Sequence, residues 1–566
     1  MPPSRSSRSS PSSISRLLSS SHPSTAPFLR ALLLGTLAQT APSLLRTLLS
    51  LLRRRPSNRL SPLAALALLF RALRPALNPR GLGVAFGVAI GGARYLEDWV
   101  EPLVRRAYER VQQAREGRRK GKAKETSESL AEEQQRAVRD EEAVRGLVTF
   151  LAGSLSSLAA LLILQSAPTS GLKTRTAKAD DALDFVVTPY APALPVQAGA
   201  EKAPREVRAE KTAGKQSATL DLTLFVFVRA ADTLVRLFHD RLVPSSPCSP
   251  SSLRGRFAPL LSFLSKHGDT LLFQLSAWRI MWCWFYRPAL LPPTYSAWIL
   301  QLARMDPRLL QLLRFAREGR YVYGQEPDEE VRRMCEGIAA HAGRDASLVN
   351  PAHISRLSCS FVHGPLGAGS CEINALKRWA RAFLDCLLIY LPVHAIPPLL
   401  FSLRKVMKQP GASVLRILLA ASRSSAFLAT FVASIYASVC LVRTRLPLFS
   451  HRLPRPLHLP QQPLDSGLCV ALGTSLCGLS VLIENPRRRR EMALYCAPRA
   501  LYAVLPEIGG RKGEVLGKAV ERAVFALSGG TVLSAVVNRP EAVSGVVRGI
   551  AGFAVGKDWR GGKTTL

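Results

Sequence analysis

Residues 147–162, LVTFLAGSLSSLAALL, form an uncharged run whose pattern returns at residues 468–483, LCVALGTSLCGLSVLI. Each run approaches the roughly 20 apolar residues that a helix needs to cross a bilayer core. Aligned without gaps, the two runs are identical at Leu147, Leu151, Ser154, Leu155, Leu158 and Leu161 of the first and Leu468, Leu472, Ser475, Leu476, Leu479 and Leu482 of the second. The runs therefore predict two equivalent membrane helices in two halves of the chain.

Other segments repeat in the same order. Residues 221–232 (DLTLFVFVRAAD) align with 491–502 (EMALYCAPRALY). Small residues recur at every fourth position, namely Gly83, Gly87 and Gly91 in the first half and Ala426, Thr430, Ser434 and Ser438 in the second. Such a stripe is a flat helix face against which another helix packs closely in lipid. Chance similarity between Leu/Ala/Ser-rich helices is the other explanation, but it has to account for three segments in one order. We expect an all-α, polytopic membrane protein with an internally duplicated helix bundle.

The composition fits a membrane protein better than a soluble nucleic-acid-binding protein. The 566 residues carry a formal net charge of +36, yet 47% are hydrophobic and the mean hydropathy is +0.10. A polytopic protein reconciles these values, because apolar residues collect in the spans and Lys/Arg in the loops. We expect five to eight membrane-embedded segments and no nucleic-acid partner. The apolar segments are 28–52, 62–73, 81–96, 146–165, 219–238, 270–286, 380–403, 413–442, 467–484 and 491–506.

The rest of the sequence suggests five parts. These are a disordered Ser/Arg-rich tail (1–27), a first membrane repeat (28–240), a connecting region (241–374), a second membrane repeat (375–510) and a C-terminal tail (511–566). Within the first repeat, 105–145 is predicted to be a charged, solvated helical stretch and 166–218 a flexible loop rich in Ala, Pro and Lys. The ten cysteines have no disulfide-type spacing, so we expect free thiols.

Four consecutive arginines, Arg487, Arg488, Arg489 and Arg490, directly follow the apolar segment 467–484. A short basic loop at this place holds a helix end on one side of a membrane. Clustered arginines also attract the anionic head groups of lipids. We therefore predict that this block fixes the topology of the preceding span and contacts head groups.

Cysteine and histidine residues gather in the connecting region. They are Cys335, His341, His353, Cys359, His363 and Cys371. Thiolate and imidazole suit a tetrahedral zinc site, but paired Cys-x2-Cys knuckles are missing, so packing and loop roles are favoured over a metal site. GPLGAG (364–369) is not followed by Lys-Ser/Thr and is interpreted as a turn rather than a phosphate loop. We expect no catalytic residues and no cofactor.

Three quoted stretches resemble the transmembrane protein 135 family, in its fungal-type form. They are SCSFVHGPLGAGSCEINALKRWARAFLDCLLIYLPVHAIPPLLF (358–401), RSSAFLATFVASIYASVC (423–440) and VLIENPRRRREMALYCAPRALY (481–502). The residues that resemble the family's cysteine-rich signature are Cys359, His363, Ser370 and Cys371. The resemblance implies a multi-span protein of peroxisomal and mitochondrial membranes, linked to organelle dynamics and to lipid or sterol handling, with no established catalytic activity. Its partners would be membrane lipids, anionic lipids or sterol among them.

Two functions of different classes follow. The first is a non-enzymatic membrane component that moves or senses lipid or shapes organelle division. The second is a duplicated translocase or channel that moves a solute or polypeptide. Polar side chains converging on a cavity would favour transport, whereas a dry seam of small residues would favour a structural role. The candidates for such a cavity are Asp221, Arg229, Glu484 and Arg499.

Overall fold

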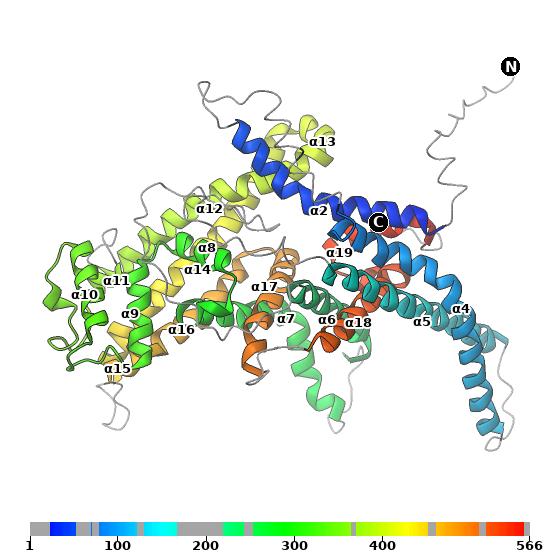
Figure 1. Ribbon diagram of the computed structural model, residues 1–566, viewed down its shortest axis with the longest axis horizontal. Coiled ribbons are helices and arrows are strands. Elements are labelled where there is room, and N and C mark those ends of the chain that lie inside the picture. The colour runs from blue at the N-terminus through cyan, green and yellow to red at the C-terminus, as the bar shows by residue number, and fades with distance from the viewer. Residues whose placement is uncertain are drawn as a thin grey trace. The chain divides into compact units, whose positions relative to one another are not determined.

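The computed structural model describes residues 23–52, 70, 78–120, 130–166, 219–242, 253–363, 370–450, 460–508 and 517–559. Within these ranges every regular element is a helix (Figure 1), so the predicted all-α class is confirmed. The chain separates into two compact units, which we describe one at a time. Unit 1 contains α2, α4, α5, α6, α18 and α19, and unit 2 contains α7 to α17.

Five helical segments of the described chain are long and apolar enough to cross a membrane, which indicates a multi-pass membrane protein. They are Gln134–Gln165, Cys371–Ile396, Pro410–Pro447, Gln461–Ile483 and Lys518–Asn538. Five candidate spans agree with the lower limit of the predicted five to eight membrane-embedded segments. The first four overlap predicted apolar segments. The fifth was not predicted, because a glycine pair and the charged residues Glu521 and Arg522 dilute its apolar character.

Unit 1 is a bundle of long helices. They are α2 (Thr25–Leu52), α4 (Leu82–Lys120), α5 (Leu130–Gln165), α6 (Leu220–Leu242), α18 (Lys518–Asn538) and α19 (Gly545–Trp559). Neighbouring helices contact one another in the order α2–α4–α5–α18–α6. Gly83, Gly87 and Gly91 face α2, where a Cβ atom on Gly91 would lie 2.5 Å from Cβ of Phe28 and 2.8 Å from its Cα. The stripe therefore lets two backbones approach more closely than any larger residue would allow.

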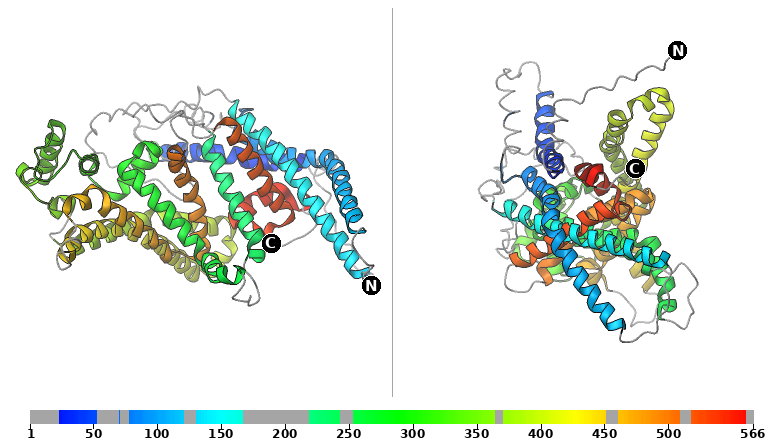
Figure 2. Two further views of the ribbon diagram at one scale, coloured as in Figure 1. Left: turned by 90° about the horizontal axis from the view of Figure 1, so that it is seen from below. Right: turned by 90° about the vertical axis from the view of Figure 1, so that its right-hand side faces the viewer.

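The charged stretch 105–145 is helical where it is described and extends α4 and α5 as a hairpin (Figure 2). A guanidinium nitrogen of Arg105 lies 3.0 Å from a carboxylate oxygen of Glu141 and forms an ion pair with it. The Tyr108 hydroxyl donates a hydrogen bond to the carboxylate of Asp140 at 2.7 Å. Most side chains of this part are exposed, as expected of a solvated stretch. Apart from Ser166, the predicted flexible loop 166–218 lies outside the described residues, as does most of the predicted tail 1–27.

Unit 2 combines long helices with a compact region of short ones. The long helices are α7 (Leu253–Tyr286), α12 (Cys371–Phe401), α14 (Pro410–Ser450), α16 with η8 (Cys469–Cys477, Gly478–Ile483) and α17 (Pro486–Ile508). The short ones are η4 (Pro288–Leu290), α8 (Pro293–Ala303), α9 (Pro307–Glu318), α10 (Glu329–Ala342), η5 (Ala346–Leu348), α11 (Cys359–His363), α13 (Leu403–Lys408), α15 (Gln461–Pro463) and η7 (Leu464–Leu468). Contacts between the long helices run α12–α14–α16–α7–α17.

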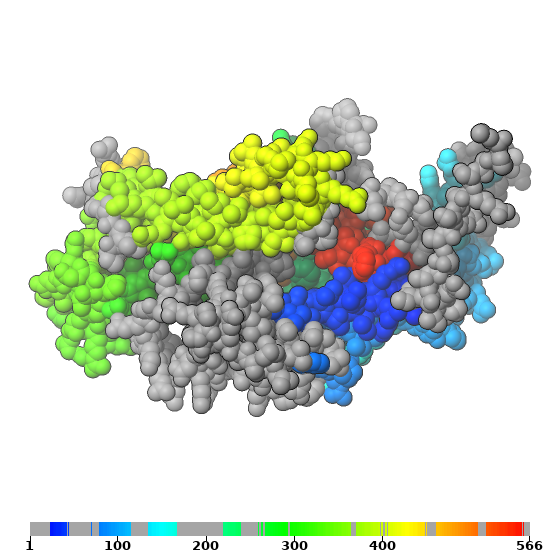
Figure 3. All heavy atoms as spheres, turned by 90° about the horizontal axis from the view of Figure 1, so that it is seen from above, coloured from blue at the N-terminus to red at the C-terminus, as the bar shows by residue number. Residues whose placement is uncertain are grey.

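The short helices of unit 2 follow local signals in the sequence. Asp306 and Asp328 cap the N-termini of α9 and α10 by accepting from backbone N–H groups. Gly319 and Gly343 end these helices in the left-handed conformation that glycine adopts without strain. In contrast, α12 carries a row of exposed leucines and forms a continuous stretch of the surface in Figure 3. Such a face suits contact with lipid.

The two units share an order of helices. The chain α2–α4–α5–α18–α6 in unit 1 parallels α12–α14–α16–α7–α17 in unit 2. Both α7 and α18 end in an Arg-Pro pair that starts a 3-10 turn, with φ −138° and ψ 60° at Arg287 and φ −139° and ψ 66° at Arg539. A further helix, α8 or α19, begins five residues after each proline. In sequence α7 follows α6 but packs in unit 2, and α18 follows α17 but packs in unit 1.

These packing partners differ from the predicted division of the chain. The segment 511–566, expected to be a tail, holds α18 and α19, whose apolar faces pack in unit 1. The connecting region 241–374 includes α7, which belongs to the helix bundle of unit 2. A division that follows chain order misses both, because α18 and α19 pack in unit 1 although unit 2 precedes them in sequence, and α7 packs with helices that lie far beyond it.

The glycine stripe yields a first prediction. Gly91→Ala forces a methyl group into the backbone of Phe28, and we expect it to destabilise the protein by about 1–3 kcal/mol. Gly146→Ala is the matched control, because nothing lies within 4 Å of its added Cβ and a helix interior gains about 0.5–1 kcal/mol from this change. Thermal unfolding of the detergent-purified protein measures both. Equal melting temperatures would contradict the close α2–α4 approach.

Candidate functional site

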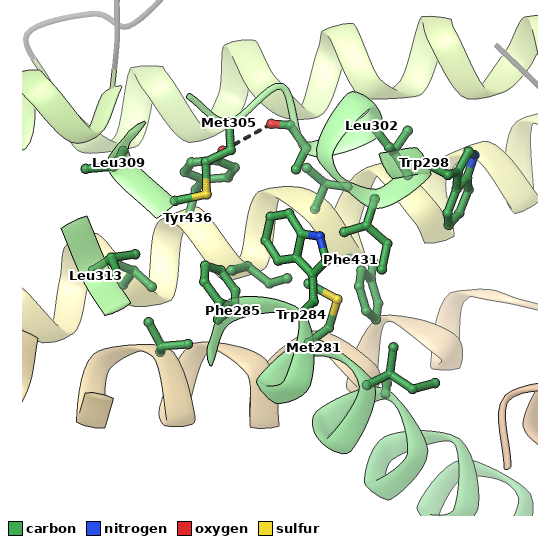
Figure 4. A pocket seen from close by; sticks show the side chains of 18 of the residues that line it. Met281, Trp284, Phe285, Trp298, Leu302, Met305, Leu309, Leu313, Phe431 and Tyr436 are labelled. Carbon is green, nitrogen blue, oxygen red and sulfur yellow. Dashed lines mark hydrogen bonds between the residues drawn. The ribbon is translucent and has the colours of Figure 1, made fainter. Parts of the chain in front are cut away.

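Unit 2 encloses an apolar cavity of about 200 Å³ between α7, α8, α9, α12, α14, α16 and α17. Aromatic and aliphatic side chains from helices far apart in the sequence point into it (Figure 4). Those labelled there are Met281, Trp284, Phe285, Trp298, Leu302, Met305, Leu309, Leu313, Phe431 and Tyr436. A concave, mainly apolar space with a few polar groups is the usual form of a small-molecule site.

Two aromatic side chains that line the cavity donate hydrogen bonds to backbone carbonyls of α8. Nε1 of Trp284 donates to the carbonyl of Ser296 at 3.1 Å, and the hydroxyl of Tyr436 donates to the carbonyl of Ala303 at 3.1 Å. Both bonds hold α8 against the long helices. Because these donors are satisfied, the two rings present apolar surface to the cavity.

One end of the cavity is polar and centres on a buried ion pair. The guanidinium of Arg443 on α14 bonds both carboxylate oxygens of Asp465, which lies in the π-helical turn η7. Arg443 also donates to the carbonyl of Leu357 at 3.1 Å. The hydroxyl of Tyr323 donates to Asp465 and accepts from the N–H of Leu357 at 3.2 Å. Burial, reinforced by the Asp465 carboxylate, raises the pKa of the Tyr323 phenol, so the phenol remains a donor.

A basic cleft of about 440 Å³ adjoins the cavity. Leu302, Ala303 and Val432 line both spaces. The charged residues of the cleft are Arg304, directly after α8, and Lys377, Arg378, Arg381 and Asp385 of α12. Arg304 and Asp385 form an ion pair of 2.7 Å. The guanidinium of Arg378 stacks on the ring of Tyr436, 3.8 Å from its centroid.

Two cations of the cleft face solvent. Lys377 and Arg381 are exposed and lie one helical turn apart near the start of α12. They are therefore available to an anionic group that enters the cleft.

Four cysteine and histidine side chains meet where α11, α12 and α14 approach one another. The ligand-type atoms of Cys359, His363, Cys371 and Cys440 all lie within 4.8 Å of one another. Sγ of Cys440 is 3.6 Å from Nε2 of His363, and both residues are only 1% exposed. Three of these residues belong to the predicted Cys/His set and to the family signature.

The surroundings of Cys359 differ from those of a free thiol. A hydrogen bond from the Cys440 thiol, the nearby Arg443 guanidinium and a hydrogen bond from Cys371 lower the pKa of Cys359. Cys371 is the first residue of α12. Ser370, the fourth signature residue, caps the same helix by accepting from the N–H of Ile373.

The other three residues of the predicted Cys/His set lie apart from this cluster. Cys335 is buried in the apolar core around α10, and burial raises its pKa to about 12. His341 is half exposed and 3.9 Å from Asp306, and His353 is exposed. The sequence analysis did not include Cys440 because it lies in an apolar helix, far along the chain from the other three and without a recognisable spacing.

The arginine block at Arg487–Arg490 opens α17, and Arg488 and Arg489 bond within unit 2. Arg489 donates to the carbonyls of Leu482 at 2.7 Å and Glu484 at 2.9 Å, so it satisfies the end of η8. Arg488 donates to Oγ of Ser424 at 3.0 Å and contacts His394, whereas Arg487 is exposed. The topology role of the block stays a prediction.

The four residues predicted to line a polar cavity are divided between the two units. In unit 1, the buried Arg229 donates to Oγ of Ser544 at 2.9 Å, and Asp221 lies in the first turn of α6. In unit 2, the buried Glu484 accepts from Oγ of Ser424 at 2.6 Å and precedes α17, and Arg499 lies almost four turns along that helix. Neither of the unit 2 residues lines the apolar cavity.

The second small-residue stripe, on α14, contacts two helices. Oγ1 of Thr430 accepts from Nε1 of Trp379 on α12 at 2.9 Å. A Cβ atom on Gly473 of α16 would lie 3.7 Å from Cβ of Ser438. Ala426 and Ser434 are partly buried on the same helix. The stripe therefore contacts α12 at Thr430 and α16 at Ser438.

The ion pair at the polar end of the cavity yields a second prediction. Arg443 is 3% and Asp465 4% exposed, so Asp465→Asn leaves a buried guanidinium without its counter-charge. We expect a loss of about 3–5 kcal/mol, seen as a lower melting temperature in detergent. Glu141→Gln in the exposed pair with Arg105 is the control and is expected to have no measurable effect. Similar small effects in both variants would show that the buried pair does not stabilise unit 2.

Comparisons with known proteins found no similar sequence or structure. The sequence matches no family model, and no curated protein and no solved structure matches it. The resemblance to the transmembrane protein 135 family therefore rests on the quoted motifs and stays a prediction. The cavity, the cleft and the Cys/His cluster are interpreted from their own geometry.

Proposed function

We propose that this protein is a non-enzymatic, multi-pass protein of an organelle membrane that binds an anionic acyl lipid and takes part in lipid handling or membrane dynamics. The observation that carries the proposal is the shared wall of the apolar cavity and the basic cleft at Leu302, Ala303 and Val432. A lipid with a hydrocarbon chain and an acidic head group requires these two environments side by side.

The cavity supplies the environment for the chain. Its lining is almost entirely aromatic and aliphatic, and the lining indole and phenol groups of Trp284 and Tyr436 are bonded elsewhere. Transfer of a CH₂ group from water into such a site is worth about 0.8 kcal/mol, so even part of an acyl chain gains several kcal/mol. Flexible side chains such as Met281 and Met305 adapt to a chain of variable shape.

The cleft supplies the environment for an acidic head group. Lys377 and Arg381 are exposed cations beside the wall shared with the cavity. A sterol presents only a neutral hydroxyl group and gains little from them, so the cleft favours a carboxylate or a phosphate. Arg304 is already paired with Asp385 and is a weaker candidate.

The position of the cleft on α12 fits entry from a bilayer. The charged residues occupy the first half of this helix, and exposed leucines such as Leu384 and Leu388 follow. Cations at the start of an apolar helix remain at the depth of the head groups while the apolar part contacts acyl chains. A peroxisomal or mitochondrial membrane is the location that the family resemblance implies.

The parallel order of helices supports an internal duplication. Each repeat would comprise five long helices, a 3-10 turn and a following helix, with the fifth helix packed in the other repeat's unit. The matched backbone angles at Arg287 and Arg539 favour common descent of α7 and α18 over chance. Such repeats are typical of transporters, and this favours the alternative function, a translocase or channel for a solute or polypeptide.

Filling the cavity tests the lipid site. Leu313→Trp adds an aromatic ring to the wall, and we expect saturable labelling by a photoreactive palmitate to fall about tenfold, which corresponds to ~1.4 kcal/mol. Leu388→Trp places the same side chain on the outer face of α12, where the native leucine is 75% exposed, and should not change the labelling. Equal labelling of both variants would refute the cavity as the site.

Removing the charges of the cleft tests the class of lipid. In the double variant Lys377→Gln and Arg381→Gln, palmitate labelling should fall about three- to tenfold, since each exposed ion pair contributes about 0.2–1 kcal/mol. Labelling by a photoreactive sterol should not change. Lys408→Gln with Arg416→Gln removes two exposed charges elsewhere in unit 2 and is the control. A loss of sterol labelling in the cleft variant would contradict a head-group role.

Liposomes that contain the purified protein discriminate the two functions. Release of an entrapped water-soluble dye through the wild-type protein would favour a channel. Retention of the dye, together with saturable palmitate labelling, would favour lipid binding.

A further inference from the structure

We propose that Cys359, His363, Cys371 and Cys440 bind one zinc ion in a closed, structural site. The site is separate from the lipid function proposed above. It combines two residues of α11, the first residue of α12 and a residue of α14. Three thiolates and one imidazole are a common ligand set of structural zinc sites.

The distances fit tetrahedral coordination. With Zn–S of about 2.3 Å and Zn–N of about 2.0–2.1 Å, tetrahedral ligand atoms lie about 3.5–3.8 Å apart. Sγ of Cys440 and Nε2 of His363 are 3.6 Å apart, and no pair of ligand atoms exceeds 4.8 Å. Small rotations of the side chains are enough to close the remaining difference.

The backbone holds the ligands in place. Cys359 and His363 are four residues apart and so lie on the same face of α11. Arg378 donates to the carbonyl of His363 at 2.9 Å, and Arg443 bonds the carbonyl of Leu357, two residues before the first ligand. Such outer bonds orient ligands in known metal sites.

The charge of the occupied site is small. Three thiolates, a neutral imidazole and Zn²⁺ carry a net charge of −1, so the ion removes two of the three negative charges that the thiolates alone would carry. Arg443 lies one turn beyond Cys440 on α14, and its guanidinium, which is paired with Asp465, bonds the carbonyl of Leu357 close to the first ligand.

A zinc ion explains why a short segment is ordered at this place. Helix α11 has only five residues and is too short to be stable by itself. The ion would fasten α11 and the start of α12 to α14, which supplies Tyr436 and Val439 to the cavity wall. A disulfide is the competing use of these thiols, but it would join only two of the three.

The test is the metal content of the full-length protein, purified in detergent under reducing conditions from zinc-supplemented cells. We expect about one zinc ion per wild-type chain and at least a fivefold lower content in Cys440→Ala. Cys386→Ala is the matched control, because Cys386 is also fully buried in a long helix but lies outside the cluster. It should retain the wild-type content.

Cobalt substitution of the wild-type protein keeps the test valid if Cys440→Ala does not fold. Co²⁺ in the proposed site should give a thiolate-to-cobalt charge-transfer band and the intense visible bands of tetrahedral coordination. His363→Cys should retain one zinc ion and shift these bands. Wild-type protein with less than one zinc per ten chains and no such bands would overturn the proposal, as would a disulfide among the three cysteines or full zinc retention in Cys440→Ala.

Discussion

Unit 2 depends on the buried ion pair between Arg443 and Asp465. Two charges removed from water are costly unless each of their hydrogen bonds is made, and here both partners are almost completely enclosed. The pair joins α14 to η7, while Arg443 and the Tyr323 hydroxyl together bond both backbone groups of Leu357. These bonds fix the irregular segment that precedes α11. The polar end of the cavity and the backbone that carries Cys359 are therefore positioned by the same few side chains.

The cavity and the Cys/His cluster share more than this ion pair. Arg378 stacks on Tyr436 in the cavity wall and bonds the carbonyl of His363 in the cluster, and it also lines the basic cleft. A change at any of the three places would shift the guanidinium and so reach the other two. The proposed lipid site and the proposed zinc site are thus connected through Arg378.

The sequence allowed much of the fold to be predicted, because apolar runs near 20 residues determine membrane helices by themselves. The helical class, four of the five candidate spans and the close-packing glycine stripe follow from local pattern alone. The cluster was predicted only in part, since Cys359 and His363 share a helical turn but Cys440 reaches them through tertiary packing. The partners of α7 and α18 also depend on tertiary contacts. The cavity was not predicted, because aromatic residues at helical spacing look the same whether they fill a core or surround a space.

The late position of α18 in the chain has a consequence for how the protein is made. Unit 1 needs α18, which the ribosome produces only after all of unit 2. At about 5–20 residues per second, the interval between Leu242 and Lys518 takes roughly 15–55 s. During that time the glycine and serine face of α5, with Gly153 and Ser157, has no native partner. This face stays uncovered until α18 is made, so a chain that ends before α18 lacks part of the bundle that was synthesised first.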